Sequence, residues 1–155
     1  MGVGITVENL NAWYGKGQAL YDINLKVAAN HATALIGPSG CGKSTFIRCL
    51  NRMHETVPGA AVEGTVRIGN LDLYANGTSP VDVRRGVGMV FQKANPFPAM
   101  SIYDNVAAGL KLSGHYRRRE LDEVVEHALR MAALWPISSL GRATSATVSR
   151  NSTFS

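Results

Sequence analysis

The sequence is most informative at Gly37-Pro38-Ser39-Gly40-Cys41-Gly42-Lys43-Ser44, which matches the phosphate-binding P-loop pattern in full. Glycines in such a loop let the backbone curl, so that successive N–H groups point inward at an anion. The helix expected after the loop turns its N-terminus, with its unbonded N–H groups, toward the same anion. Lys43 can then reach the β- and γ-phosphates of a nucleotide, Ser44 can ligate Mg²⁺, and Thr45 can add a phosphate contact.

The flanks of the loop supply the context that the pattern requires. Ala32–Ile36 is short and nearly all apolar, which predicts a strand covered on both faces. After the loop, apolar residues recur at helical spacing at Phe46, Ile47, Leu50 and Met53. A strand, a loop and a helix in this order favour a nucleoside triphosphate site over the alternative, a glycine-rich turn without a ligand.

Three further strands are expected. Ile5–Leu10 is one, and the alternation of Ile23, Leu25 and Val27 with polar residues predicts a second, half-buried one. The third is an alternating segment, in which one face carries Val62, Gly64, Val66 and Ile68.

The segment after these strands changes in character. Val87–Phe91 is another apolar strand candidate, and Ser101 is a credible helix cap beyond an extended proline loop. One long amphipathic helix follows, marked by apolar residues from Leu121 to Ala132. Residues 136–155 are rich in Ser and Thr and hold none of the 11 acidic residues, which predicts a disordered tail.

Composition excludes several classes of protein. The chain has 155 residues, 45% hydrophobic and 17% charged, as expected of a folded domain, and no apolar run long enough to span a bilayer. Its start lacks the features of a signal peptide, and two cysteines are too few for a disulfide framework, so we expect a cytoplasmic setting. The net charge of +5 allows nucleic-acid binding, but no recognised binding module accompanies it, and we expect no nucleic-acid partner.

Several segments beside the P-loop resemble the ATPase subunits of ABC transporters, and in particular the phosphate-import branch, over about residues 5–135. The resemblance is carried by Tyr14 and by four runs: Asp22-Ile23-Asn24-Leu25, Leu50-Asn51-Arg52-Met53, Gly88-Met89-Val90-Phe91-Gln92 and Asn95-Pro96-Phe97-Pro98-Ala99-Met100-Ser101-Ile102. It implies an α/β fold: a P-loop NTPase (RecA-like) core with an N-terminal antiparallel β subdomain and a partial helical subdomain, truncated at the C-terminus. The implied domains are residues 1–92 (nucleotide-binding core), 93–135 (Q-loop and incomplete helical subdomain) and 136–155 (unrelated tail).

The resemblance also implies roles for individual residues. Tyr14 would stack on the adenine of ATP, although its neighbour Trp13 could do so instead, and a packing aromatic at a strand edge is the structural alternative. Gln92 would be the Q-loop glutamine, contacting Mg²⁺ and the water near the γ-phosphate. Residues 93–103 would accept the coupling helix of a membrane permease subunit. The implied partners are permease subunits, a second ATPase subunit and, indirectly, a phosphate-binding protein, at the cytoplasmic face of the membrane.

Members of the resembled family carry motifs that this chain lacks. The sequence has no Leu-Ser-Gly-Gly-Gln signature, no apolar strand ending in Asp-Glu (Walker B) and no switch histidine after them. In the family, the Walker B Asp anchors Mg²⁺ and the adjacent Glu is the general base for the attacking water. Without them, we expect ATP hydrolysis by this chain alone to be severely impaired. Loss of the Walker B strand would also leave Ala32–Ile36 exposed. Alternatives are an importer subunit for another solute, a non-catalytic nucleotide-binding fragment and, less favoured, a small-molecule kinase.

Overall fold

The computed structural model describes residues 2–114 and 117–134. The chain divides into two compact units, Met1–Val90 and Phe91–Ser155, and each is described by itself. The tail expected at residues 136–155 lies outside the described residues. No helix in the described part is long and apolar enough to cross a membrane.

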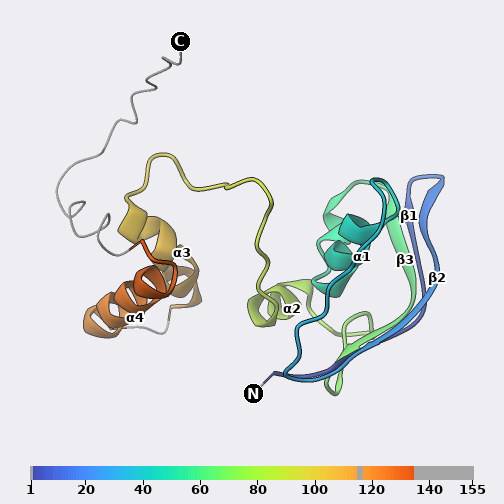
Figure 1. Ribbon diagram of the computed structural model, residues 1–155, viewed down its shortest axis with the longest axis horizontal. Coiled ribbons are helices and arrows are strands. Elements are labelled where there is room, and N and C mark those ends of the chain that lie inside the picture. Colours follow the sequence, from blue (N-terminus) through green and yellow to red (C-terminus); the bar gives the residue numbers. More distant parts are fainter. Residues whose placement is uncertain (1, 115–116, 135–155) are drawn as a thin grey trace, which may run out of the picture. The chain divides into compact units, whose positions relative to one another are not determined.

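The first unit is built on an antiparallel sheet of four strands, which confirms the expected β subdomain. The strands are β1 (Ile5–Tyr14), β2 (Gly17–Val27), β3 (Ala60–Ile68) and β4 (Leu71–Asp72), arranged in the order β2-β1-β3-β4. Figure 1 shows the long strands β1, β2 and β3 bending together, with the helix α1 (Lys43–Leu50) on their concave face. β1 is longer than expected, since it continues from Leu10 to Tyr14.

A bulge in β1 explains why the alternation of apolar and polar residues predicts a shorter strand than the structure shows. Asn9 has a positive φ of 51°, and the register with β3 passes from Glu8 opposite Thr65 directly to Asn11 opposite Glu63. Two residues of β1 therefore face Gly64 of β3, which has a φ of 100°. The extra residue shifts the phase of the strand, so that the buried positions are Val7 and then Leu10 and Ala12.

The core of the first unit lies between this sheet and α1. It combines apolar side chains of β1, β2 and β3 with those of α1, of the helix α2 (Pro80–Gly86) and of the residue that follows β4: Val7, Leu10, Ala12, Leu20, Phe46, Cys49, Val66, Leu73 and Val83. The face expected on β3 is confirmed, because Val66 is buried while Val62 and Ile68 pack on the same core. On α1 the buried face is Thr45, Phe46 and Cys49, so the expected place of Ile47 in it is wrong.

Two expected strands do not form. Residues 32–36 have no regular secondary structure and are all exposed, Ile36 to 94%, so the expectation of a strand covered on both faces is wrong. Residues 87–91 are likewise not in a strand, and Val90 is 97% exposed. A strand needs a neighbour for its backbone N–H and C=O groups, and no described strand is hydrogen-bonded to either segment. The exposure expected for residues 32–36 is confirmed, whereas the strand itself is not.

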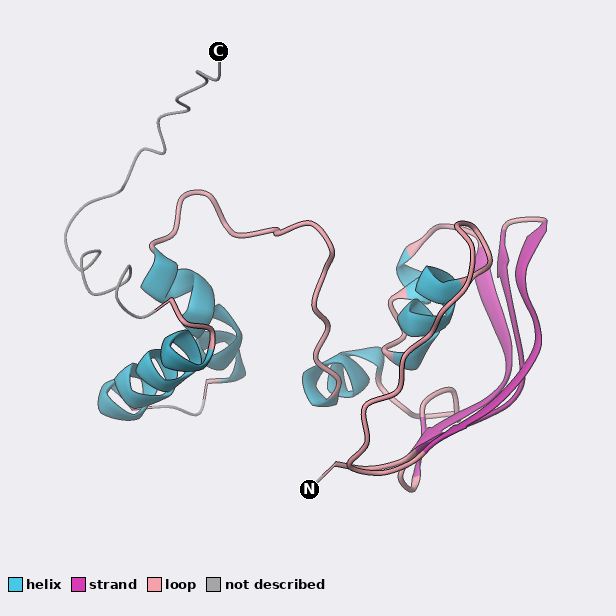
Figure 2. Cartoon of the chain, viewed as in Figure 1, coloured by secondary structure: helices cyan, strands magenta, loops and turns pink. Residues whose placement is uncertain are grey.

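The second unit pairs two helices, α3 (Ile102–Ser113) and α4 (Arg118–Met131), drawn in cyan in Figure 2. Ser101 caps α3 as expected, since its side-chain oxygen accepts a hydrogen bond of 3.0 Å from the Asp104 N–H. Asn105 binds the loop before the cap through the Phe97 carbonyl and N–H. The shared core consists of Ala107, Leu121, Val125 and Leu129, a narrower stripe on α4 than the sequence predicts.

Candidate functional site

The loop Gly37–Ser44 takes a shape that only glycine allows at two of its positions. Gly40 and Gly42 have φ angles of 82° and 93°, in the region that other residues rarely adopt. A Cβ on Gly42 would lie 2.8 Å from the Leu20 Cδ2 and 3.0 Å from the Ala19 carbonyl oxygen. Gly42 therefore does two things: it turns the chain into α1, and it lets the loop approach β2 closely.

The helix α1 begins directly at the end of this loop, with Gly42 as its N-cap. The first helical hydrogen bond runs from the Phe46 N–H to the Gly42 carbonyl, at 2.8 Å. The N–H groups of Lys43, Ser44 and Thr45 come before it and have no acceptor within the helix. Together with the helix dipole, these donors form an end suited to a phosphate group.

The Lys43 side chain reaches back across the whole loop. Its Nζ donates to the carbonyl oxygens of Gly37 and Pro38, at 2.6 Å each, and lies 3.4 Å from the Cys41 Sγ. Because the Lys43 side chain starts on α1 and its ammonium reaches Gly37, the first residue of the loop, the ammonium lies over the curled backbone of the loop. It can therefore exchange these neutral acceptors for a phosphate oxygen, because hydrogen bonds between charged groups are stronger.

The two hydroxyls at the start of α1 differ in exposure. Ser44 is exposed, whereas Thr45 is buried on the core face of the helix with 8% exposure. Ser44 is thus the hydroxyl that a metal ion near the loop could meet. Among the described residues, no three or more His, Cys, Asp or Glu side chains are grouped so that they could hold a metal ion. A Mg²⁺ bound by one hydroxyl and the phosphates fits the residues present, because this ion keeps several non-protein ligands.

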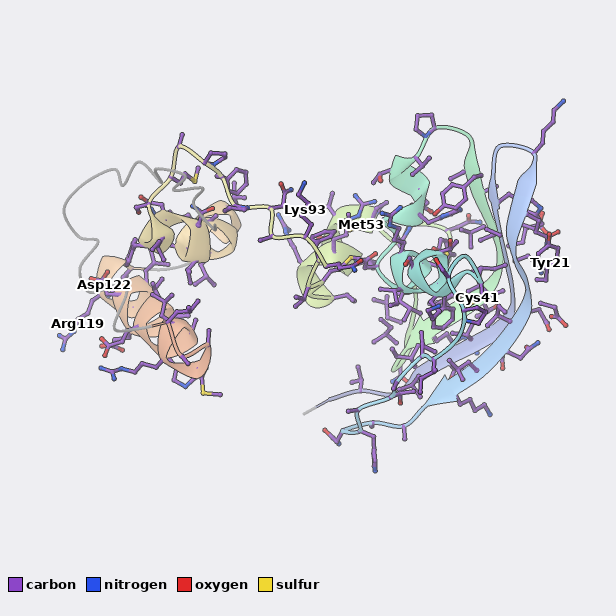
Figure 3. The ribbon with its side chains drawn as sticks, turned by 45° about the horizontal axis from the view of Figure 1, so that its top comes forward. Tyr21, Cys41, Met53, Lys93, Arg119 and Asp122 are labelled. Carbon is purple, nitrogen blue, oxygen red and sulfur yellow. The ribbon has the colours of Figure 1, made fainter. Side chains whose placement is uncertain are left out.

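The two cysteines stand in opposite environments. Cys41 is an exposed free thiol on the loop and is labelled in Figure 3 on the side of the sheet that carries α1. Cys49, in the last turn of α1, is a buried free thiol. Burial raises the pKa of Cys49 from 9.0 to about 11, against the opposing effect of its hydrogen bond with Tyr74.

An apolar cavity of about 150 Å³ lies between β2 and the loop. Its wall is formed by side chains of β2, of the segment before the loop and of α1: Leu20, Ile23, Leu25, Leu35, Ile36, Cys41, Gly42, Lys43 and Phe46. Because Lys43 is the only charged residue in that wall, the cavity does not have the donors that a triphosphate needs. The phosphate-binding chemistry belongs to the loop and the helix end.

Tyr14 is the last residue of β1, and the phase of the strand after the bulge gives it the same face as Leu10 and Ala12. That face packs on α1, while Trp13 alternates to the opposite one. The Tyr14 ring is half-buried and meets the His54 ring at a centroid distance of 4.5 Å and an interplanar angle of 63°. No spacing pattern in the sequence connects His54 with Tyr14.

Gln92 is exposed and belongs to the second unit. The structure thus brings Lys43 together with Gly37, Pro38 and Cys41, and it joins Tyr14 to His54. The role of Gln92 at a metal ion stays a prediction, as do the roles of the other site residues.

Comparisons with known proteins agree on one family. A profile of the ABC transporter family matches residues 20–151. The phosphate import ATP-binding protein PstB of Koribacter versatilis is 65% identical over 135 residues, covering 87% of this chain and 53% of that protein. Its counterpart in Rubrobacter xylanophilus is 64% identical over 131 residues, covering 84% and 46%. This chain thus spans about half the length of these relatives.

A solved structure is similar as well. It is a bacterial Atm1-family ABC exporter with ATP bound, with a TM-score of 0.70 at 28% identity, covering 88% of this chain and 21% of that one. The expected ABC ATPase fold is thereby confirmed.

Proposed function

The chain belongs to the ABC transporter family, and we propose that it forms the nucleotide-binding part of the ATP-binding subunit of a phosphate importer. One observation carries the proposal: α1 begins at the end of the loop Gly37–Ser44, so its first N–H groups have no acceptor within the helix, and the Lys43 ammonium reaches back to the Gly37 and Pro38 carbonyls. A triphosphate is the ligand that such an arrangement of donors suits best.

In this proposal each part of the site has a defined task toward Mg-ATP. The N–H groups of Lys43, Ser44 and Thr45 bind phosphate oxygens, and the Lys43 ammonium leaves the Gly37 and Pro38 carbonyls for the β- and γ-phosphates. The Ser44 hydroxyl would hold Mg²⁺, and a role for Gln92 at that ion is proposed from the family resemblance alone. Tyr14 stacks on the adenine. The magnesium ion would neutralise phosphate charge.

The solute is inferred from the relatives rather than from the site. Four curated relatives that are 56–65% identical to this chain bear the name phosphate import ATP-binding protein PstB. The phosphate assignment depends on that identity, because a nucleotide site has no contact with the transported solute. The partners that follow are permease subunits, a second ATPase subunit and, indirectly, a phosphate-binding protein, at the cytoplasmic face of the membrane.

Nucleotide binding is tested by isothermal titration of the full chain with Mg-ATP. We expect saturable binding with little release of phosphate. Lys43→Ala should weaken binding about tenfold or more, because it removes a charge-assisted hydrogen bond to the ligand. Lys26→Ala, at an exposed lysine of β2, is the matched control and should leave binding unchanged. Absence of binding by the unmodified chain would refute the nucleotide site.

The solute is tested separately with a chimera. Residues 2–134 of this chain would replace the aligned half of the Koribacter versatilis relative in cells that lack their own subunit. Uptake of radiolabelled phosphate should be restored by the chimera and not by its Lys43→Ala form. A chimera that accumulates and binds ATP but restores no phosphate uptake would refute the solute and leave the nucleotide site standing.

A further inference from the structure

His54 is a buried polar residue that the proposed nucleotide site does not use. It opens the short helix η1 (His54–Thr56), four residues after the end of α1, and its exposed fraction is 0%. Histidine is not among the residues most often fully buried, so its surroundings explain its position better than its hydrophobicity does. Those surroundings are the last two residues of β1.

The imidazole contacts Trp13 and Tyr14 in different ways. His54 Nε2 lies 2.8 Å from the Trp13 carbonyl oxygen. A carbonyl oxygen only accepts, so Nε2 carries the proton and donates. The same ring packs against the Tyr14 ring, with the centroids 4.5 Å apart and the planes inclined by 63°. One side chain thus holds both the backbone that leads into Tyr14 and the tyrosine ring itself.

The other imidazole nitrogen of His54, Nδ1, is in a different situation from Nε2. Nδ1 is buried and has no hydrogen-bond partner among the described residues. A buried nitrogen without a partner destabilises the fold, and an apolar side chain of similar size would avoid that cost. The histidine is therefore best explained by what it does for its neighbours rather than by its own stability.

The position of His54 also links the two ends of the proposed site. The helix α1 starts at the end of the phosphate-binding loop and ends at Leu50, and η1 begins at His54, four residues further along. The turn after Tyr14 is held to the segment between η1 and β3, because the Gly15 N–H donates to the Gly59 carbonyl at 2.9 Å. A short and hydrogen-bonded path therefore connects the loop with the aromatic residue at the end of β1.

We propose that His54 is a positioning residue for the nucleotide base: it holds the Tyr14 ring, and the backbone before it, in the orientation that stacks on adenine. This inference rests on the proposed function, since it needs a nucleotide whose phosphates lie in the loop. It assigns His54 to recognition of the base and not to binding of the phosphates. Loss of His54 should therefore weaken the binding of ATP much more than that of a ligand without a base.

The test compares Mg-ATP with magnesium tripolyphosphate, which has the phosphates but no base, by titration of the full chain. His54→Phe keeps a ring against Tyr14 and loses the donor, whereas His54→Gln keeps a donor and loses the ring. Each should weaken ATP binding about two- to tenfold, the range of an aromatic contact, with tripolyphosphate affinity unchanged. In a Tyr14→Ala background neither substitution should weaken ATP binding further. His31→Gln is the matched control, since His31 is exposed and also bonds a carbonyl, that of Ala29.

The outcomes separate the two proposals. If the unmodified chain binds ATP no better than tripolyphosphate, the base site of the proposed function fails, and the role of His54 fails with it. If ATP binds better but the His54 variants weaken both ligands equally, or neither, only the positioning role is overturned. A nuclear Overhauser contact between the His54 and Tyr14 rings in the unmodified chain is expected, and its absence would overturn the inference even if both variants failed to fold.

Discussion

The glycine opposite the bulge in β1 should be among the least replaceable residues of the first unit. Gly64 has a φ of 100°, and a Cβ added there would lie 2.4 Å from the Asn9 carbonyl oxygen, 2.7 Å from the Asn9 carbonyl carbon and 2.8 Å from the Glu8 oxygen. All three are backbone atoms of the neighbouring strand. No rotation of a side chain can relieve the contact, so Gly64→Ala must displace the bulge itself.

Two contributions set the size of the effect. An alanine in this φ region costs about 1–3 kcal/mol. Forcing a methyl group into closely packed backbone costs about another 1–3 kcal/mol. We therefore expect Gly64→Ala to lower the free energy of unfolding by about 2–6 kcal/mol, a large part of the roughly 5–15 kcal/mol that holds a native domain together.

The assay is urea unfolding followed by circular dichroism, with two glycine controls. Gly77 has a φ of 89° but nothing within 4 Å of its Cβ position, so Gly77→Ala should cost only the backbone strain, about 1–2 kcal/mol. Gly86 ends α2 with an ordinary φ and open space, so Gly86→Ala should be neutral or stabilising. If Gly64→Ala costs no more than Gly77→Ala, the close backbone contact is not real and the reasoning fails.

Three other substitutions or treatments test the rest of the structure. Gly42→Ala would place a methyl group against a side chain and a carbonyl of β2, so the loop must shift, and Mg-ATP affinity measured by calorimetry should fall about tenfold; unchanged affinity would contradict the loop geometry. The exposed Cys41 should be alkylated by iodoacetamide at pH 8 in the native chain, while Cys49, with its pKa raised to about 11, should react only in denaturant; mass spectrometry would show equal labelling if burial were wrong. The pKa of Asp104 is held below its ordinary 3.8 first by the Lys111 hydrogen bond, so it favours folding above that pH and loses the effect on acidification; Lys111→Ala should raise this pKa in an NMR titration, and no shift would argue against the pair.

The loop and the helix after it were predictable because their chemistry is local. Glycine at positions 40 and 42 is required by the backbone angles of those residues alone. The cap at Ser101 is equally local, since a hydroxyl and an N–H three residues apart define it. Alternation also located β3 and its buried face correctly.

Elements that depend on distant partners were harder to predict. Apolar runs at residues 32–36 and 87–91 favour strands, but the described sheet offers them no neighbour. The sequence does not distinguish the helix α2 from a turn, because Ser79 and Pro80 are common both in turns and at the start of a helix. The contact between Tyr14 and His54 joins residues 40 positions apart, and no periodic pattern encodes such a pair.

The bulge at Asn9 has a consequence for how this protein tolerates changes in length. Ile5 and Val7 before the bulge share a face with Leu10, Ala12 and Tyr14 after it only because the bulge takes up one residue between them. A deletion at Asn9 would leave a regular strand in which Ala12 and Tyr14 still face α1. Insertions or deletions elsewhere in β1 would instead turn Trp13 toward His54. Relatives should therefore vary in length at this one point of the strand and keep a fixed spacing from Leu10 onward.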